Sequence, residues 1–279
     1  SITMRLILHG GEEVEKSMTI KIISLLSEKS LRRKGQHPNH PRVLVCAPTG
    51  RAASLINGVT IHSAFSFNFG KEFIGLKGKQ LAKFRENLKH LKLLIIDEMS
   101  LIGADMVYKI HKRLSLEIFQ NEEPFGGISV LLVGDLLQLP PVNGTFIFKA
   151  PSNKHFASFH NVCPLWRTFE PMILKHNHRQ GEGGEWADAL NRFREGIVTS
   201  EDEELLVRRV VPNRTSDPNS MLLCYKNRIA NDHNENMLNA LDSPPIFVQA
   251  SKEQPRGCKA TIQPHGTIDN TRFMNLLTI

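Results

Sequence analysis

The segment His90–Ser100, with the sequence HLKLLIIDEMS, constrains the fold more than any other part of the chain. Its apolar run Leu91–Ile96 is interrupted only by Lys92 and ends abruptly at Asp97 and Glu98. Such a run is typical of a strand buried on both faces of a parallel sheet. Because open α/β sheets bind ligands beyond the carboxyl ends of their strands, the Asp can hold Mg²⁺ there and the Glu can polarise a water molecule. A strand that runs into a solvated turn is the alternative.

The composition of the 279-residue chain limits the protein classes to which it can belong. Hydrophobic residues make up 41% of it, yet no run approaches the ~18 apolar residues of a membrane-spanning helix, so a soluble protein without a membrane partner is expected. Lys and Arg outnumber Asp and Glu by 35 to 28, which weakly favours a polyanionic partner. The four cysteines form no CxxC pair, so a disulfide framework or zinc ribbon is not expected and a reducing compartment fits best.

A first strand, predicted over Met4–Leu8, is followed by a glycine-containing loop, a Lys-Ser pair and the apolar-periodic segment Met18–Leu26. This order is typical of a phosphate-binding loop, in which backbone N–H groups and a helix N-terminus surround the phosphates of a nucleotide. In the pattern G-x-x-x-x-G-K-[ST], Lys16 would reach the β- and γ-phosphates and Ser17 would bind Mg²⁺. The nucleotide-binding candidates are Gly10, Gly11, Lys16 and Ser17.

The same loop departs from the pattern at its second glycine, which is replaced by Glu15. A Cβ and a carboxylate then stand where the backbone should lie against a phosphate, and Glu12 and Glu13 add further negative charge. Weak or absent ATP binding at this loop is therefore expected. An ordinary acidic turn between a strand and a helix is the alternative.

Polar and hydroxyl-bearing segments follow the next predicted strand, Val43–Ala47. The motif PTGRAA comes directly after it, and TIHSAF follows one helical turn later. Such residues at strand ends can hold phosphodiester oxygens through N–H and O–H donors, contacts that position a nucleic-acid strand without reading its sequence. The candidate DNA-contacting residues are Thr49, Gly50, Thr60, His62 and Ser63. A packed or turn histidine is the alternative for His62.

Residues 67–92 form a basic segment in which lysines alternate with Phe69, Phe73 and Phe84. Basic residues interleaved with aromatic ones can form a surface that follows phosphates and stacks on bases. A solvated amphipathic helix over Gln80–Leu91 is equally consistent with this pattern.

A helix is predicted over Ala104–Ile118, because apolar residues recur on one face while three basic residues lie elsewhere. The apolar residues are Met106, Ile110 and Leu114, and the basic ones are Lys109, Lys112 and Arg113. A further buried strand, Ile128–Val133, ends in Gly-Asp and is followed by Gln138. The amide of this glutamine would lie where a γ-phosphate or an attacking water can be sensed.

Four motifs together, APTGRAA with TIHSAF, IIDEMS, VLLVGDLLQLPPV and LKHNHRQ, resemble the PIF (petite integration frequency) family of superfamily-one DNA helicases. The resemblance covers roughly residues 4–240 and is greatest to the metazoan and transposon-associated branch. It implies an α/β fold, a RecA-like P-loop NTPase with a parallel sheet and helices on both faces. It also implies an enzyme that hydrolyses ATP with Mg²⁺, moves 5′ to 3′ along single-stranded DNA and unwinds duplex at junctions.

The resemblance also implies roles for individual residues. Lys16 and Ser17 match the phosphate-loop lysine and Mg²⁺ ligand, and Asp97 and Glu98 match the Mg²⁺-associated acid and the catalytic base. Two further residues match groups that contact the γ-phosphate, Gln138 as a sensor and Arg179 as the motif arginine. A fixed guanidinium there would offset the charge that develops during phosphoryl transfer.

The expected organisation is a first RecA-like domain over residues 1–210, with the basic segment as a small insertion, a linker over 211–219 and a partial second RecA-like domain over 220–279. The second would open with a strand over Met221–Tyr225 and a helix over Ile229–Leu241. Resemblance further implies a monomer in the nucleus, or alternatively the mitochondrion, with roles in DNA repair, recombination and telomere maintenance.

Two other functions remain open on the sequence. Glu15 and the short second domain favour a catalytically impaired relative that acts as a nucleic-acid-binding module. A RecD-like ATPase shares APTGRAA but fits GDLLQLPPV and NHRQ less well.

Overall fold

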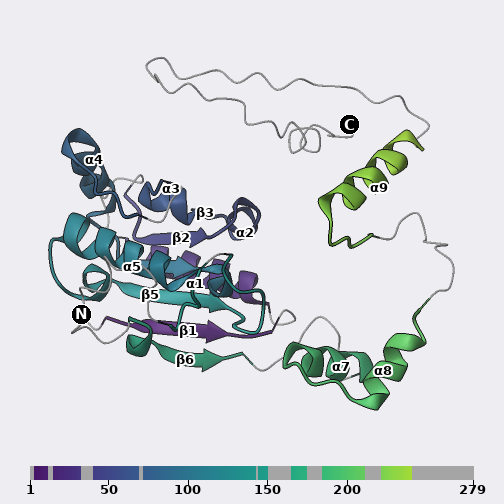
Figure 1. Cartoon of the computed structure of the whole chain (residues 1–279). Helices are drawn as coiled ribbons and strands as arrows, with labels where there is room; N and C mark the ends of the chain where they lie inside the picture. The colour runs from purple at the N-terminus through teal and green to yellow at the C-terminus, as the bar shows by residue number, and fades with distance from the viewer. Residues whose placement is uncertain are drawn as a thin grey trace. The chain divides into compact units, whose positions relative to one another are not determined.

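The computed structural model describes residues 3–11, 15–32, 40–68, 72–142, 144–149, 165–174, 184–210 and 221–240. The chain divides into two compact units, residues 1–209 and 210–279 (Figure 1). Each unit is described by itself below.

Within the described residues, the first unit is built on a parallel sheet of six strands in the order β3-β2-β4-β5-β1-β6. The strands are β1 (Arg5–His9), β2 (Val43–Ala47), β3 (Val59–Thr60), β4 (Leu93–Ile96), β5 (Ser129–Gly134) and β6 (Glu170–Ile173). The apolar run that ends at Asp97 supplies β4, which lies between β2 and β5 and is buried on both faces. The α/β class expected from the sequence is therefore confirmed.

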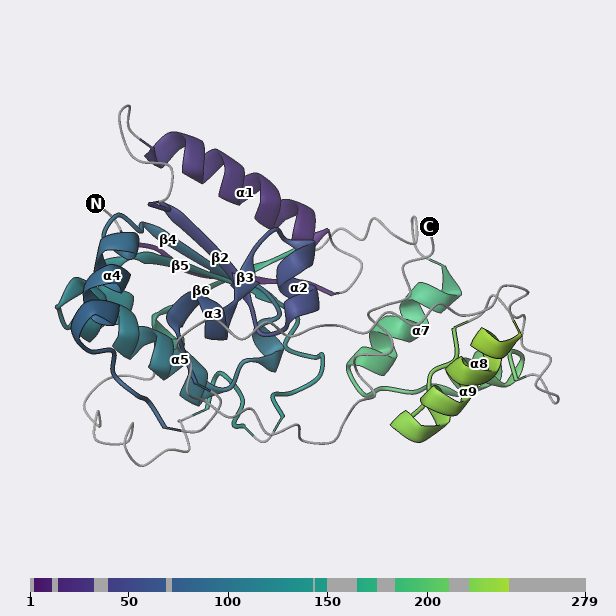
Figure 2. The ribbon, with the colours of Figure 1, turned by 90° about the horizontal axis from the view of Figure 1, so that it is seen from above.

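Helices cover both faces of this sheet (Figure 2). The described helices of the first unit are α1 (Lys16–Leu31), α2 (Gly50–Leu55), α3 (Ile61–Phe65), α4 (Gly78–Leu88), α5 (Ala104–Lys112), α7 (Glu185–Arg194) and α8 (Ser200–Val207). Short 3₁₀ turns span Met99–Leu101, Pro124–Gly127 and Leu165–Thr168. Because side chains alternate along a strand, β4 sends Ile95 towards the α1 and α2 side and Leu94 and Ile96 towards the α3 and α5 side.

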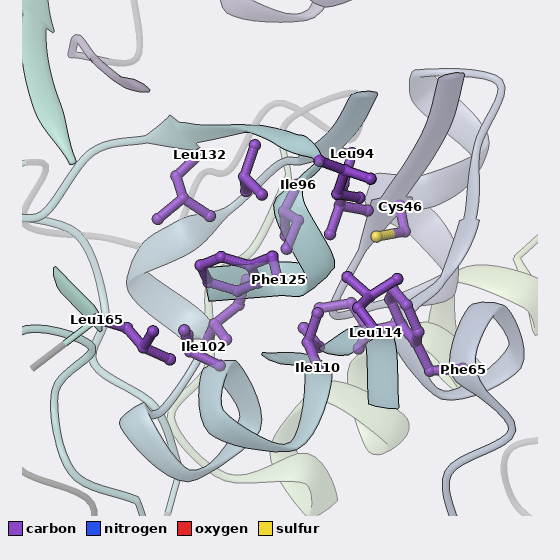
Figure 3. Close-up of a cluster of buried hydrophobic side chains, with 14 of the residues drawn as sticks. Cys46, Phe65, Leu94, Ile96, Ile102, Ile110, Leu114, Phe125, Leu132 and Leu165 are labelled. Carbon is purple, nitrogen blue, oxygen red and sulfur yellow. The ribbon is translucent and has the colours of Figure 1, made fainter. Parts of the chain in front are cut away.

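The larger core lies on the α3 and α5 side of the sheet (Figure 3). It packs Leu94 and Ile96 of β4 against Phe65, Ile110 and Phe125, all of which are at most 1% exposed. The close packing of aromatic and branched side chains leaves the strands little freedom to shift. This core therefore holds the carboxyl ends of β4 and β5 at fixed positions relative to each other.

The predicted helix over residues 104–118 is only partly regular. The α-helix α5 stops at Lys112, and a π-helix continues over Arg113–Phe119. Arg113 is fully buried and Lys109 is 5% exposed, so the prediction that they lie away from the packed face was wrong. Burial is tolerated for Arg113 because its guanidinium pairs with Glu117 and donates to the Ile74 carbonyl oxygen at 3.2 Å.

Two rings of the basic segment lie against this buried guanidinium. The Arg113 guanidinium carbon is 5.1 Å from the ring centre of Phe67 and 4.9 Å from that of Phe73. Phe84 packs against the larger core, and Phe69 lies outside the described residues. Phe73 and Phe84 therefore take part in internal packing. Their rings are not free to stack on bases, so the alternation of basic and aromatic residues in this segment does not by itself make a nucleic-acid-binding surface.

The second unit is described over residues 221–240. Its helix α9 spans Asn227–Asn239, close to the predicted helix, but the strand predicted over Met221–Tyr225 was wrong. Met221 and Leu223 are 86% and 89% exposed, and no strand pairs with them among the residues that are described. An apolar run alone forms no strand without a neighbour that supplies the ladder. The assignment of this unit to a second RecA-like domain stays a prediction.

Unfolding should depend on pH through His111, which lies near the end of α5. Its Nδ1 accepts a hydrogen bond from the Phe125 N–H at 3.0 Å, and burial lowers its pKa to about 4. Because the unfolded value is higher, the folded state binds fewer protons, so this stability is fully present above the unfolded pKa of 6.5 and is lost as the pH falls towards 4. We expect a loss of about 2 kcal/mol between about pH 7.5 and pH 5, measured by urea unfolding. Equal pH slopes in the parent and a His111→Asn variant would contradict this.

Candidate functional site

Four strands of the parallel sheet end at the same edge. In the register of the sheet His9 lies beside Gly134, and Ile96 lies beside both Leu132 and Cys46. The loops that leave β1, β2, β4 and β5 therefore start next to one another. Parallel sheets bind ligands at such an edge, and every described nucleotide-site residue predicted from the sequence lies in one of these loops or directly after it.

The loop after β1 is tied to its neighbours by its own backbone. The Gly10 N–H donates to the Gly134 carbonyl oxygen at 3.1 Å, which joins this loop to the end of β5. The Lys16 ammonium donates to the carbonyl oxygens of Gly10 and Gly11 at 3.1 and 2.5 Å. The side chain of Lys16, the first residue of α1, thus folds back over the loop. From this position its ammonium group can exchange the carbonyl oxygens for phosphate oxygens as hydrogen-bond acceptors.

Glu15, which replaces a glycine of the loop pattern, lies at the N-cap of α1. Its side chain makes no capping hydrogen bond and is exposed, and its backbone φ is −66°. Ser17 is also exposed on the first turn of α1. Because its φ is negative, the backbone at Glu15 does not require glycine, and the exposed carboxylate can turn to solvent. The negative charge nevertheless remains next to the loop.

The two acids after β4 differ in their surroundings. The Asp97 N–H donates to the Cys46 carbonyl oxygen at 2.9 Å, and its carboxylate, in a residue only 6% exposed, accepts from the Glu98 N–H at 2.9 Å. Burial raises the pKa of Asp97, whereas the Glu98 N–H and the Lys16 charge act in the opposite direction. Glu98 adopts the left-handed conformation with φ 54°, an uncommon one for glutamate that is typical of functional sites.

The turn after β5 is organised by Asp135, whose side chain is completely buried. Its carboxylate accepts from the Leu137 N–H at 3.0 Å, and its carbonyl oxygen accepts from the Gln138 N–H at 3.1 Å. His9, directly before the phosphate loop, lies 3.5 Å away from the same carboxylate and accepts from the Leu136 N–H at 3.4 Å. The pKa of His9 lies below its usual value, mainly because of burial. Asp135 raises this pKa, whereas the charges of Arg194 and Lys16 lower it further.

A cavity of about 500 Å³ opens beside these loops. Glu98 and Gln138 line it together with Thr49 and Arg51 from the PTGRAA motif. The remaining wall is mostly apolar and comes from Ala52, Leu55, Leu101, Leu137 and Leu139. The predicted catalytic glutamate, the predicted sensor and one predicted DNA-contacting residue therefore share a single cavity.

The hydroxyl groups of the predicted DNA-contacting residues cap two short helices. Thr49 accepts from the Ala52 N–H at 3.2 Å at the start of α2, and Thr60 accepts from the Ser63 N–H at 3.3 Å at the start of α3. The Thr60 hydroxyl also donates to the Ser63 hydroxyl oxygen at 2.9 Å. Burial lowers the pKa of His62, and Lys109 lowers it further. Beside Gly50, an added Cβ would meet nothing within 4 Å.

A sequence profile of the PIF1-like helicase family matches residues 19–204, more than half of the chain. The chain belongs to the PIF1-like helicase family. It is 36% identical over 163 residues to the ATP-dependent DNA helicase PIF1 of Emericella nidulans, which covers 57% of this chain and 21% of that protein. It is 28% identical over 209 residues to the ATP-dependent DNA helicase Pif1 of Bdellovibrio bacteriovorus, covering 74% of this chain and 45% of that protein. The match thus spans less than half of either relative.

Solved structures of PIF1-like helicases share this fold. The crystal structure of Bacteroides Pif1 bound to ssDNA matches with a TM-score of 0.63 at 28% identity, covering 84% of this chain and 53% of that one. The crystal structure of Pif1 helicase from Candida albicans matches with a TM-score of 0.63 at 27% identity, over 86% of this chain and 52% of that one. The same family thus accounts for both the sequence motifs and the parallel sheet.

For some residues of this PIF1-like chain the predicted and the observed site differ, either because a predicted residue is not described or because a residue at the site was not predicted. Arg179 lies outside the described residues, as does the linker 211–219. His9, Asp135 and Arg194 were not predicted as site residues, although the Gly-Asp pair at the end of β5 was a usable signal for Asp135. Within the described segments no group of three or more His, Cys, Asp or Glu side chains could hold a metal ion, and no helix there is long and apolar enough to cross a bilayer.

Proposed function

We propose that this chain carries the ATPase core of a DNA helicase that hydrolyses ATP, moves 5′ to 3′ along single-stranded DNA and unwinds duplex at junctions. The observation that supports this most directly is the shared sheet edge, where Lys16 and Asp97 interact electrostatically and Glu98 lines one cavity with Gln138. The relatives are named ATP-dependent DNA helicases, and one solved neighbour is bound to ssDNA. Another is in complex with ADP-AlF₃ and ssDNA, which supports nucleotide use.

The nucleotide would lie across the loops after β1, β4 and β5. Gly10, Gly11 and Lys16 would hold the phosphates, and Ser17 with Asp97 would hold a Mg²⁺ ion. The buried carboxylate of Asp97, whose pKa burial raises, fits this assignment because a cation would stabilise its charged form. The bound Mg²⁺ would neutralise charge on the phosphate oxygens.

Catalysis would rest on Glu98 and Gln138. Glu98, which lines the cavity, would orient the attacking water and accept its proton, and Gln138 would sense the γ-phosphate from the turn after β5. We assign Arg179 to the γ-phosphate by family resemblance alone. Thr49, Gly50, Thr60, His62 and Ser63 would contact the DNA backbone through amide and hydroxyl groups.

Further assignments belong to the same proposal. The first unit would be the first RecA-like domain, the basic segment its insertion, and residues 220–279 the start of a second RecA-like domain. The chain would act as a monomer in the nucleus, or alternatively the mitochondrion, and the metazoan and transposon-associated branch stays a prediction. The family match favours this function over a RecD-like ATPase.

A second candidate function is a nucleic-acid-binding module that has lost hydrolysis. The exposed Glu15 carboxylate at the N-cap of α1 favours it, because the loop then brings negative charge towards the phosphates. Such a module would bind DNA independently of ATP, and its affinity would fall steeply with salt.

Glu15 and Lys16 provide the variants that separate the two functions. If the helicase function holds, the chain hydrolyses Mg-ATP in a DNA-stimulated reaction and Lys16→Ala lowers the rate by roughly 10²-fold or more. Glu15→Gly should then strengthen nucleotide binding, because it removes a charge beside the phosphates. The measurements are phosphate release and titration with a fluorescent ATP analogue. The non-hydrolysing module would be supported instead if only the Glu15→Gly variant bound nucleotide, and if the parent bound DNA with the same affinity with and without ATP.

A further inference from the structure

Arg194, the last residue of α7, joins two loops of the nucleotide site. Its Nε lies 2.7 Å from Asp135 Oδ2, and its Nη2 donates to Asp135 Oδ1 at 3.0 Å. The guanidinium therefore makes one hydrogen bond and one close ionic contact with the buried carboxylate, because Nε and Oδ2 lack hydrogen-bond geometry. The third nitrogen, Nη1, faces the phosphate loop, since a Cβ added at Gly11 would lie 3.2 Å from it.

The two loops that meet at this guanidinium carry different parts of the proposed chemistry. The Gly11 carbonyl oxygen also accepts a hydrogen bond from the Lys16 ammonium at 2.5 Å. The glycine therefore lies between two cations, Lys16 and Arg194. Asp135 holds the Leu137 N–H and, through its own carbonyl oxygen, the Gln138 N–H. A shift of the Arg194 side chain would thus change the positions of both the phosphate loop and the turn that carries Gln138.

A second arginine on the same helix makes a comparable ion pair elsewhere. Arg192 pairs through Nε and Nη2 with both carboxylate oxygens of Asp202, the Nε contact being 2.8 Å. This pair joins α7 to α8, and Asp202 also belongs to the capping box of α8. Arg192 is therefore a control on the same helix, because its guanidinium also pairs with a buried carboxylate, through two hydrogen bonds, but ties α7 to α8 and not to the loops of the nucleotide site.

We propose that Arg194 is a positioning residue that couples the phosphate loop to the Gln138 turn through its pair with Asp135 and the close approach of its Nη1 to Gly11. The role rests on the proposed ATPase function but involves no contact with the nucleotide. A guanidinium whose charge is already offset by a buried carboxylate contributes little to phosphate binding. Its effect lies in fixing the distance between Lys16 and Gln138, on which alignment for hydrolysis depends.

The test compares Arg194→Met with Arg192→Met in the full chain. Hydrogen exchange without nucleotide should speed up by about tenfold or more at both Gly10–Gly11 and Leu136–Gln138 in Arg194→Met, and at neither in Arg192→Met. In ATP hydrolysis Arg194→Met should lower kcat by about tenfold with KM changed by less than about threefold. Arg194→Lys, which keeps the charge but not the planar guanidinium that reaches both Asp135 and the phosphate loop, should restore little of either property.

Gly11→Ala supplies a variant that leaves the ion pair in place. Its methyl group would press on Nη1, so exchange at Leu136–Gln138 should change although the substitution is in the other loop, and this remote effect should vanish when Arg194→Met is added. Exchange that changes in one loop only, or equally in Arg192→Met, overturns the proposal. A raised KM at unchanged kcat also overturns it, because Arg194 would then bind nucleotide directly. If the parent hydrolyses no ATP, the proposed function fails, but the exchange comparison still decides the role of Arg194.

Discussion

Replacing Glu98 with glutamine is expected to lower DNA-stimulated ATP hydrolysis by roughly 10²- to 10⁴-fold, the range that a general base contributes. The amide keeps the size of the side chain and the left-handed backbone of Glu98 but cannot accept a proton from water. Binding of a fluorescent ATP analogue and of single-stranded DNA should change little, since Lys16 and the predicted DNA-contacting residues are intact. Phosphate release under saturating Mg-ATP and DNA measures the effect.

The matched control for this substitution is Glu204→Gln, which removes a carboxylate on the exposed face of α8. Glu204 pairs with Arg208 at 3.2 Å, and both side chains are largely exposed, so the change should leave hydrolysis and stability almost unaltered. Hydrolysis by Glu98→Gln within a few fold of the parent would refute the role given to Glu98. The base would then have to come from another group.

Gly134→Ala should cause the largest loss of stability at the site, about 3 kcal/mol, from backbone strain and overpacking together. Gly134 has φ 151°, and a Cβ there would lie 2.8 Å from the Met99 nitrogen and 3.0 Å from its Cγ. Met99 directly follows Glu98, so relief of this contact must move the glutamate. We therefore expect hydrolysis to fall together with the free energy of unfolding, which urea titration measures.

Gly196→Ala separates the two causes of that loss. Gly196 also has a positive φ, 77°, but an added Cβ meets nothing within 4 Å, so only the backbone cost of about 1 kcal/mol is expected and hydrolysis should be retained. Similar losses in the two variants would show that the contact with Met99 is accommodated without cost. The steric argument for Gly134 would then be wrong.

Four strands of the sheet, β1, β2, β4 and β5, could be predicted because burial leaves a plain signal, a short apolar run with an abrupt polar end. The strands β3 and β6 were not predicted, because β3 has only two residues and β6 is exposed. Val43–Ala47 is predicted to the residue, and the acids after β4 lie at the predicted strand end. The family resemblance placed α9 to within two residues at each end, and periodicity placed α5, although the α-helix ends at Lys112 and not at Ile118. These elements follow from local sequence, since neighbours only a few residues away decide them.

Features that depend on distant partners could not be predicted in the same way. Arg113 looks like a surface residue until Glu117 and the rings of Phe67 and Phe73 are placed around it. Asp135 and Arg194 are separated by 59 positions, and neither shows in the sequence which charge it meets. For the same reason an apolar run at Met221 predicted a strand that the described residues do not form.

The place of β1 in the sheet has a consequence for the synthesis of the protein. β1 is made before the other described strands of this sheet, yet its neighbours on the two sides are β5 and β6, which lie far along the chain. Such non-local pairing is slow, and an emerging chain cannot complete it until residues up to Ile173 have left the ribosome. The phosphate loop that follows β1 is therefore assembled late, so a nascent chain shorter than this should capture no nucleotide.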